Sequence, residues 1–274
     1  MDKRIEKAIE SVSPARAVAI LTNYANSLED HARAFAHNRK AGVEWADNAE
    51  ICAFGALEAN KPIIKAIRVV VETDNDIENP AEYGGWKVAS FNRRHAAYQD
   101  PDRWFDGGEP IDGAAFDEGR AFKLAYYEHS LCQWSLSGEG PRCRFDTVDC
   151  AGVLYYDGAD DGADDGLPDG YEAREKAARA FLVVYTDWCN GAGLGYRIEL
   201  IDDMGDAKEA DSCWGFYDSD ADHMCGEIAS AVLALLKEHP GATVEYGGEL
   251  GSDYRHKIGD AMMATKCAEL PSDV

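Results

Sequence analysis

The sequence predicts an α+β fold, in which an N-terminal helical hairpin (residues 1–61) precedes a main domain (residues 62–274) made of an antiparallel or mixed sheet with packed helices. Three patterns lead to this prediction. Apolar side chains recur every three or four residues through most of the first 60 residues. A run rich in β-branched residues follows at 63–71. In the last third of the chain, amphipathic helical patterns alternate with strand patterns.

Two helices are expected in the N-terminal hairpin. Ser13 is suited to cap the first of them, and Pro14 is suited to its first turn. The apolar stripe of this helix comprises Val18, Leu21, Ala25, Leu28, Ala32 and Phe35. The second, shorter helix ends before Pro62, and its apolar side comprises Ile51, Phe54 and Leu57. Residues 1–68 hold ten basic and nine acidic residues. This charge-balanced hairpin is therefore a candidate docking element and a candidate homodimer interface through residues 1–60.

Strand patterns recur through the main domain. The expected strands lie at residues 63–71, 86–91, 122–127, 153–156, 195–201, 211–217 and 243–246. We expect the strand at 63–71 to pair with the strand at 86–91. The acidic turn at 202–206 is expected to join its two flanking strands into a hairpin.

Two amphipathic helices are expected in the last third of the chain. The first covers about residues 172–188, with an apolar face of Ala173, Ala177, Phe181, Val184 and Trp188. Ser219 is suited to cap the second helix. The apolar face of this second helix comprises Met224, Ile228, Val232 and Leu235. The charged tail after the last strand is expected to be helical as well.

The charge balance restricts the classes of partner. The chain has 27 basic and 51 acidic residues, which give a net charge of −24. A broad basic face for DNA, RNA or an anionic membrane is therefore excluded. No apolar run approaches the roughly 18 residues that span a bilayer. The charged N-terminus lacks the apolar region of a secretion signal, so we predict a cytoplasmic protein.

The acidity is concentrated in residues 146–225, which hold 20 acidic and five basic residues. Like charges at this density repel each other and lower stability. One interpretation is a solvated face without a specific role. The sharper interpretation is a surface that meets a basic partner.

Three segments are similar in order and spacing to a known group of sequences. They run from residues 70–74 through 92–95, from 127–130 through 152–156, and from 195–199 through 211–217. The string Asp-Ser-Cys-Trp-Gly-Phe-Tyr at 211–217 is the most specific part. Over roughly residues 65–240 the chain resembles a family of uncharacterised proteins encoded by bacteriophages and mobile elements. The resemblance implies an accessory protein of an invading element that works inside a bacterial host, and it implies no catalytic residues.

Charge and resemblance together favour a non-catalytic inhibitor of a host defence system, of the anti-CRISPR or anti-restriction type. Side chains one helical turn apart are separated by about 5–6 Å, so carboxylates on a rigid face imitate a row of phosphates. The expected partner is a basic host protein or nuclease complex, without direct contact to nucleic acid. The expected partner-binding residues are Asp157, Asp160, Asp161, Asp164, Asp165, Asp202, Asp203, Asp206, Asp218, Asp220 and Asp222.

The loop at residues 157–172 is the main candidate metal site. Its acidic residues fall at positions 1, 5, 9 and 12 of an EF-hand calcium loop, and they are Asp161, Asp165, Asp169 and Glu172. Position 3 is Ala163, and no helix is expected before the loop, so a flexible acidic loop is the simpler interpretation. The alternative function is a calcium- or magnesium-dependent enzyme or a calcium-stabilised accessory protein. Apart from this calcium site, no cofactor is expected.

Eight cysteines are spread along the chain. No pair has the C-x-x-C spacing of a structural zinc site. A chain of this length has no need of disulfides to stabilise its core, so free thiols are expected.

Overall fold

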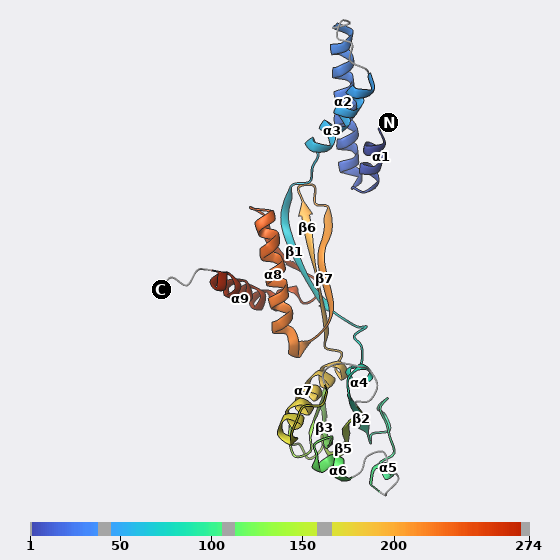
Figure 1. The fold of residues 1–274 in the computed structure, drawn as a ribbon, viewed down its shortest axis with the longest axis vertical. Helices are drawn as coiled ribbons and strands as arrows, with labels where there is room; N and C mark the ends of the chain where they lie inside the picture. Colours follow the sequence, from blue (N-terminus) through green and yellow to red (C-terminus); the bar gives the residue numbers. More distant parts are fainter. Residues whose placement is uncertain (1, 38–44, 106–112, 158–165, 270–274) are drawn as a thin grey trace.

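The computed structural model describes residues 2–37, 45–105, 113–157 and 166–269. Its elements form three bodies in a row, with the N-terminal helices at one end, a sheet with two long helices in the middle and a second sheet at the other end (Figure 1). The α+β prediction is confirmed. The residues after 62 build two separate four-stranded sheets, whereas the sequence predicts one.

The N-terminal helical body consists of α1 (Lys3–Glu10), α2 (Pro14–His37) and α3 (Trp45–Ala59). As predicted, α2 begins at Pro14, and the Ser13 hydroxyl accepts a hydrogen bond from the backbone N–H of Arg16 at 3.4 Å. The helices enclose a small core of their own. It comprises Ile5, Ile20, Tyr24, Cys52, Ala53 and Ala56.

The predicted buried faces of α2 and α3 are correct only in part. Leu21, Leu28 and Leu57 pack against the helical core as expected. Three other side chains expected inside are exposed, namely Val18, Ile51 and Phe54. The sequence pattern does not reveal α1, which packs against α2 and contributes Ile5 to the core. A helix buries whichever side its neighbours cover. The neighbours of α2 cover the side that carries Ile20 and Tyr24.

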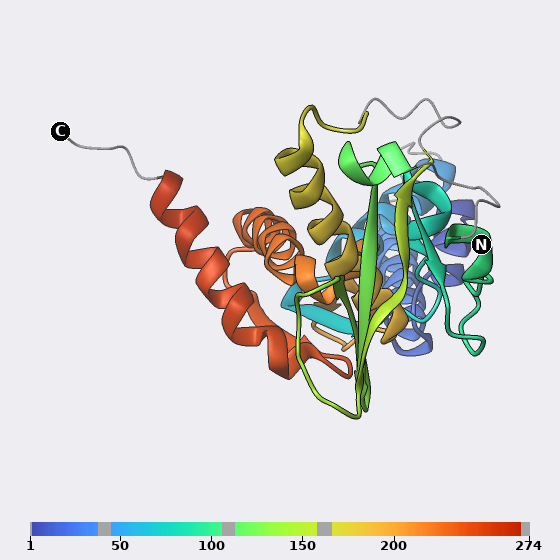
Figure 2. The ribbon, with the colours of Figure 1, turned by 90° about the horizontal axis from the view of Figure 1, so that it is seen from below.

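The central sheet comprises β1 (Ile64–Thr73), β6 (Gly193–Asp202), β7 (Ala207–Tyr217) and β8 (Thr243–Gly247), in the order β7-β6-β1-β8. Strand β1 is antiparallel to β6 and parallel to β8, so the sheet is mixed. Its inner face is covered by α8 (Ala221–Glu238) and α9 (Gly251–Glu269), which lie on one side of the strands (Figure 2). The core comprises Ile67, Val69, Val71, Tyr196, Ile198, Met224, Ile228, Val232 and Ile258, among others. The predicted hairpin, last strand, tail helix and apolar face of α8 are confirmed.

The opposite face of the central sheet carries charged side chains in alternating signs. The Arg197 guanidinium lies 2.9 Å from a carboxylate oxygen of Glu72 and 3.0 Å from one of Glu199. Arg68 lies 3.6 Å from the second carboxylate oxygen of Glu199. Such cross-strand pairs are typical of a sheet face that meets water.

The distal sheet comprises β2 (Trp86–Ser90), β5 (Thr147–Tyr156), β3 (Ala121–His129) and β4 (Leu131–Leu136), in this order and all antiparallel. Helix α7 (Tyr171–Cys189) covers one face. The short helices α5 (Asp102–Phe105) and α6 (Gly113–Asp117) lie against the other face, and α4 (Pro80–Tyr83) precedes β2. The core under α7 comprises Trp86, Leu124, Tyr126, Trp134, Leu136, Leu154, Leu182 and Tyr185, among others.

Two features of the distal body differ from the predictions. Strand β2 pairs with β5 and belongs to a different sheet from β1, because the chain passes from the central to the distal body between them. Strand β4 has no counterpart among the predicted strands. Helix α7 is confirmed, but its buried face is displaced by about one residue. The fully buried side chains of α7 are Ala178, Leu182 and Tyr185.

The junction between the two sheets uses polar contacts. The hydroxyls of Tyr83 and Tyr217 lie 2.9 Å apart. The backbone N–H of Ser219 donates to the Asp187 carboxylate at 2.9 Å, so Ser219 links α8 to α7 and the prediction that it caps α8 is wrong. Helix α8 begins after a short 3-10 turn, η1 (Asp218–Asp220), and Asp220 at its N-cap makes no side-chain cap hydrogen bond.

Candidate functional site

Three of the predicted partner-binding residues are engaged inside the protein. Asp202, Asp203 and Asp206 lie in the turn between β6 and β7, and Arg16 of α2 reaches into this turn. The Arg16 guanidinium lies 2.8 Å from carboxylate oxygens of both Asp202 and Asp203, and 4.0 Å from Asp206. It also donates to the carbonyl oxygen of Asn60 at 2.6 Å. The side chains of Arg16 and Asp202 are 3% and 7% exposed, so the Asp202 carboxylate is not available to a partner. The side chains of Asp203 and Asp206 are 34% and 35% exposed, so a partner contact at these two residues stays a prediction.

Hydrogen bonds from backbone N–H groups hold the carboxylates of Asp202 and Asp203 in place. The Asp202 carboxylate accepts the backbone N–H groups of Met204 and Asp206 at 2.8 and 3.0 Å, which is the side-chain-to-backbone bonding that stabilises Asx turns. Asp203 accepts from the backbone N–H of Ile63 at 3.2 Å. The hydrogen bond from Arg16 is the main cause that lowers the pKa of Asp203. The carboxylates of this turn therefore bind Arg16 and attach the N-terminal helical body to the central sheet.

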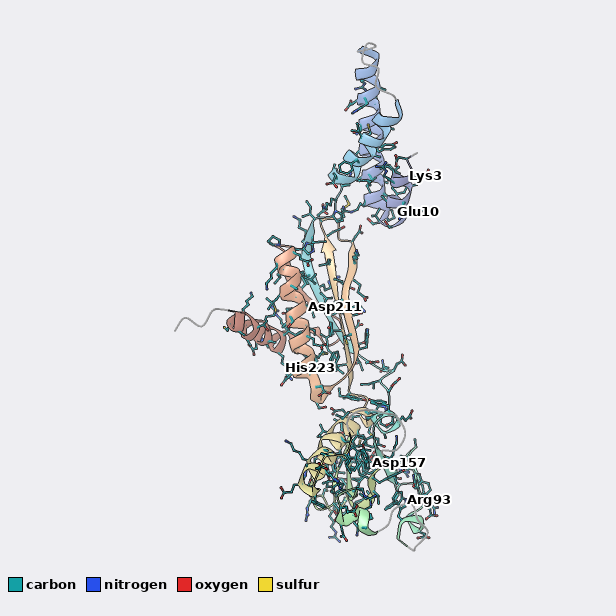
Figure 3. The ribbon with its side chains drawn as sticks, in the orientation of Figure 1. Lys3, Glu10, Arg93, Asp157, Asp211 and His223 are labelled. Carbon is teal, nitrogen blue, oxygen red and sulfur yellow. The ribbon has the colours of Figure 1, made fainter. Side chains whose placement is uncertain are left out.

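The remaining predicted acids are dispersed. Asp218, Asp220 and Asp222 are exposed near the start of α8, where Asp218 accepts from the Tyr254 hydroxyl at 2.8 Å and Asp222 lies 3.2 Å from the Lys257 ammonium. Figure 3 shows Asp157 on the distal body, well away from the central body. Four predicted residues lie outside the described residues, namely Asp160, Asp161, Asp164 and Asp165.

The proposed calcium loop is described only in part. Asp161 and Asp165 lie outside the described residues, Asp169 is exposed, and Glu172 lies in the first turn of α7. Within the described parts of the chain, no three His, Cys, Asp or Glu side chains come close enough to hold a metal ion. The eight cysteines are free thiols.

A pocket of about 410 Å³ opens on the distal body, where the end of α7 meets β3, β4 and the loop after β2. This volume lies in the range of about 300–1,000 Å³ that holds small ligands or single side chains of a partner. The aromatic part of its wall comprises His95, Tyr126, Trp134, Tyr185 and Trp188. The polar part includes Glu128, Ser130, Cys132, Cys189 and Asn190.

The aromatic wall is a continuous series of ring contacts. The ring centroids of Tyr126 and Trp134 are 4.7 Å apart, those of Trp134 and Tyr185 are 6.1 Å apart, and those of Tyr185 and Trp188 are 5.6 Å apart. The His95 ring packs edge-on against Tyr126 at 4.9 Å. Rings at these separations attract each other beyond simple burial of area.

Helix α7 also closes the free edge of the distal sheet beside the pocket. The Asn190 side chain, directly after α7, accepts the backbone N–H of Cys132 at 2.8 Å and donates to the carbonyl oxygen of Cys132 at 2.9 Å. The Thr186 hydroxyl accepts the backbone N–H of Trp134 at 3.1 Å. Edge strands expose unpaired backbone groups that attract other chains. These bonds satisfy three backbone groups on the edge of β4 and hold β4 and α7 together.

The pocket favours positive charge. Among the described residues that line it, none is lysine or arginine, and Glu128 supplies a carboxylate. Burial is the main cause that raises the pKa of both the Tyr126 and the Tyr185 phenol. Neighbouring cysteines raise the pKa of both phenols further, and Glu128 adds to the shift of Tyr126. Both phenols therefore stay neutral. A cation entering the pocket meets aromatic rings, phenol oxygens and a carboxylate.

His95 is held in one neutral tautomer. The Asn92 amide oxygen accepts the backbone N–H of Arg94 at 3.0 Å, so the Asn92 amide nitrogen faces His95 Nε2 at 3.2 Å and donates to it. His95 Nδ1–H then donates to the buried Ser90 hydroxyl at 2.8 Å. Burial lowers the pKa of His95, against a smaller opposing effect of Glu128. The neutral ring adds no positive charge to the pocket wall.

Stability is therefore expected to fall at mildly acidic pH through His95. The unfolded chain takes up a proton at His95 near a pKa of about 6.5, whereas the folded protein does so only at lower pH. The free energy of unfolding should thus decrease as the pH falls below about 6.5, until the folded pKa is reached. The free energy of unfolding, measured by urea unfolding at several pH values in this window, should fall less with decreasing pH in His95→Gln than in the unaltered protein. An equal pH dependence of the free energy of unfolding in His95→Gln and in the unaltered protein would contradict the assignment.

The sequence patterns do not reveal this pocket. Its lining residues come from four separate segments, around residues 79, 95–97, 126–134 and 185–190, and each segment alone has a simple structural explanation. The one available signal is the density of aromatic and reactive side chains in residues 126–134 and 185–189.

Comparison with known proteins finds no counterpart: no protein-family model, no curated protein and no solved structure matches the chain significantly. Among the described residues, none of the helices combines the length and the apolar character needed to cross a membrane. The site must therefore be interpreted from its own chemistry.

Proposed function

We propose that this chain is a non-catalytic binding protein that docks on a basic protein and holds a lysine or arginine side chain of that partner in the distal pocket. The single observation that supports this most strongly is the composition of the pocket wall, which combines five aromatic rings with Glu128 and includes no lysine or arginine. Aromatic rings with a carboxylate attract ammonium and guanidinium groups.

The charge of the whole chain supports the same partner class. A net charge of −24 attracts basic surfaces over several ångströms and raises the rate of encounter. Exposed acids near the start of α8 and on the distal body add to this field. Within this proposal, a basic host defence complex is the partner that the resemblance to phage-encoded proteins suggests, with the acidic surface occupying a site for nucleic acid. The alternative of a metal-dependent enzyme depends on acids of the loop at 157–172, half of which lies outside the described residues, or of the segment at 218–225.

Peptide binding tests the proposal directly. Trp134 and Trp188 line the pocket, so their fluorescence should change when an arginine-rich peptide is added and should not change with a glutamate-rich peptide of equal length. Glu128→Gln should weaken binding of the arginine-rich peptide at least about tenfold, because a hydrogen bond to a charged group is worth about 1.5–3 kcal/mol. The expected effect is measured as a change in Kd at low salt.

Glu172→Gln is the matched control, because Glu172 is exposed at the opposite end of α7. It removes the same charge and should change Kd less than twofold. Binding should also weaken at 1 M salt, where the Debye length falls to about 3 Å. Equal losses in the two variants would mean that only net charge matters and would overturn the role of the pocket.

A further inference from the structure

Two cysteines that are far apart in the sequence line the same pocket. Cys132 lies on β4 and Cys189 is the last residue of α7. The backbone of Cys132 is clamped by both hydrogen bonds of Asn190, the residue that follows Cys189. This clamp brings the two cysteines together independently of their side chains.

The two thiols also lie close enough to shift each other's pKa. Hydrogen bonding from Cys189 is the main cause that lowers the pKa of the Cys132 thiol, and the same contact is the main cause that raises the pKa of Cys189. Cys132 is partly exposed and Cys189 is exposed, so reagents in solution reach the pair. Thiolates are the reactive form of cysteine, and this pattern distinguishes an attacking thiol from a resolving thiol.

We propose that Cys132 and Cys189 are a thiol–disulfide exchange site, which small neutral or cationic disulfides oxidise to a covalent link between β4 and α7. Neither the proposed partner nor its cationic side chain is needed for this reaction. Anionic disulfides are disfavoured by Glu128 at the pocket wall and by the net charge of −24.

The reaction proceeds in two balanced exchanges. The Cys132 thiolate attacks one sulfur of the disulfide reagent, whose S–S bond breaks; the released thiolate takes up a proton and leaves as a free thiol. Cys132 then carries a mixed disulfide with the other half of the reagent. The Cys189 thiol loses its proton and attacks the Cys132 sulfur, which forms the protein disulfide and releases the second half as a thiol. Two protein thiols are oxidised, and one disulfide is reduced to two thiols.

The link would join two walls of the pocket. Oxidation fixes the end of α7 against the edge of β4, which the Asn190 and Thr186 hydrogen bonds hold only reversibly. The site thereby connects the redox state of the surroundings to the shape of the pocket.

Peptide mapping of the full chain tests the proposal. The probe is bis(2-hydroxyethyl) disulfide, which is small and neutral, followed by blocking of the remaining thiols and digestion with trypsin. Trypsin releases two peptides that contain one cysteine each. Residues 124–142 contain Cys132, and residues 180–197 contain Cys189. We expect these two peptides to be joined by a disulfide that dithiothreitol reverses. Recovery of both peptides unlinked, or linked to other cysteines, would overturn the proposal.

Single variants separate the two roles. In Cys189→Ser, Cys132 should retain the reagent as a stable mixed disulfide, because the resolving thiol is gone. In Cys132→Ser, Cys189 should react more slowly than Cys132 does in Cys189→Ser, because burial still raises the pKa of the Cys189 thiol after Cys132 is removed. Cys267→Ser, at an exposed position of α9, is the matched control and should leave the 124–142 to 180–197 link unchanged. Mixed disulfides forming equally fast in both single variants would contradict the assigned roles. The mapping of the unaltered chain remains decisive even if a variant folds poorly.

Discussion

Replacing Arg16 with methionine is expected to lower the free energy of unfolding by about 3–5 kcal/mol, because the substitution leaves the buried Asp202 carboxylate without its partner. Arg16 is 3% exposed and Asp202 is 7% exposed, and their closest nitrogen and oxygen atoms lie 2.8 Å apart. Arg16 also joins the N-terminal helical body to the central sheet. We therefore expect faster proteolysis at the junction near Asn60 as well as a lower midpoint in urea.

Two further variants make this test specific. Arg33→Met is the matched control on the same helix, since Arg33 is 71% exposed and pairs with Glu29; the loss there should stay within about 1 kcal/mol. The double variant Arg16→Met with Asp202→Asn should recover part of the stability, because it removes the buried charge together with its partner. Equal losses for the Arg16 and Arg33 variants would show that the ion pair is solvated.

Leu154→Ala is expected to destabilise the distal body by about 2–5 kcal/mol while it leaves the central body intact. Leu154 is fully buried beneath α7, so its truncation opens a cavity. The central core has its own set of buried residues, none of them shared with the cluster around Leu154. Ile228 is a fully buried residue of α8. Ile228→Ala should therefore destabilise the central body and leave the distal body intact.

Hydrogen exchange of backbone amides measures this selectivity. Leu154→Ala should speed exchange in β3 and β5, and Ile228→Ala should speed exchange in β1 and β6, each with little effect on the other sheet. If both variants speed exchange equally in both sheets, residues 62–274 unfold as one cooperative domain. That outcome would support the single main domain predicted from the sequence.

The placement of the acidic residues shows why charge patterns alone are ambiguous. Asp202 and Asp203 belong to the most acidic part of the sequence, and Arg16 lies almost 190 residues earlier in the charge-balanced hairpin. A local count of charges assigns the turn to the surface, whereas the fold brings a single arginine to it. Asp220, in contrast, is exposed as predicted, because it lies at the solvent side of the start of α8.

The sequence by itself determined the type and approximate limits of most elements, because helical and strand periodicity and turn chemistry depend on residues within a few positions of one another. The start of α2 at Pro14, the hairpin of β6 and β7 and the inner face of α8 follow from such local patterns. Only the tertiary structure decided that β2 leaves the first sheet, which side of α2 and α3 is buried, and that Cys132 meets Cys189. These features depend on contacts between segments that are tens of residues apart, and similar local patterns are compatible with several such pairings. The pocket belongs to the second group, since its aromatic wall is assembled from segments that local patterns explain equally well as ordinary core.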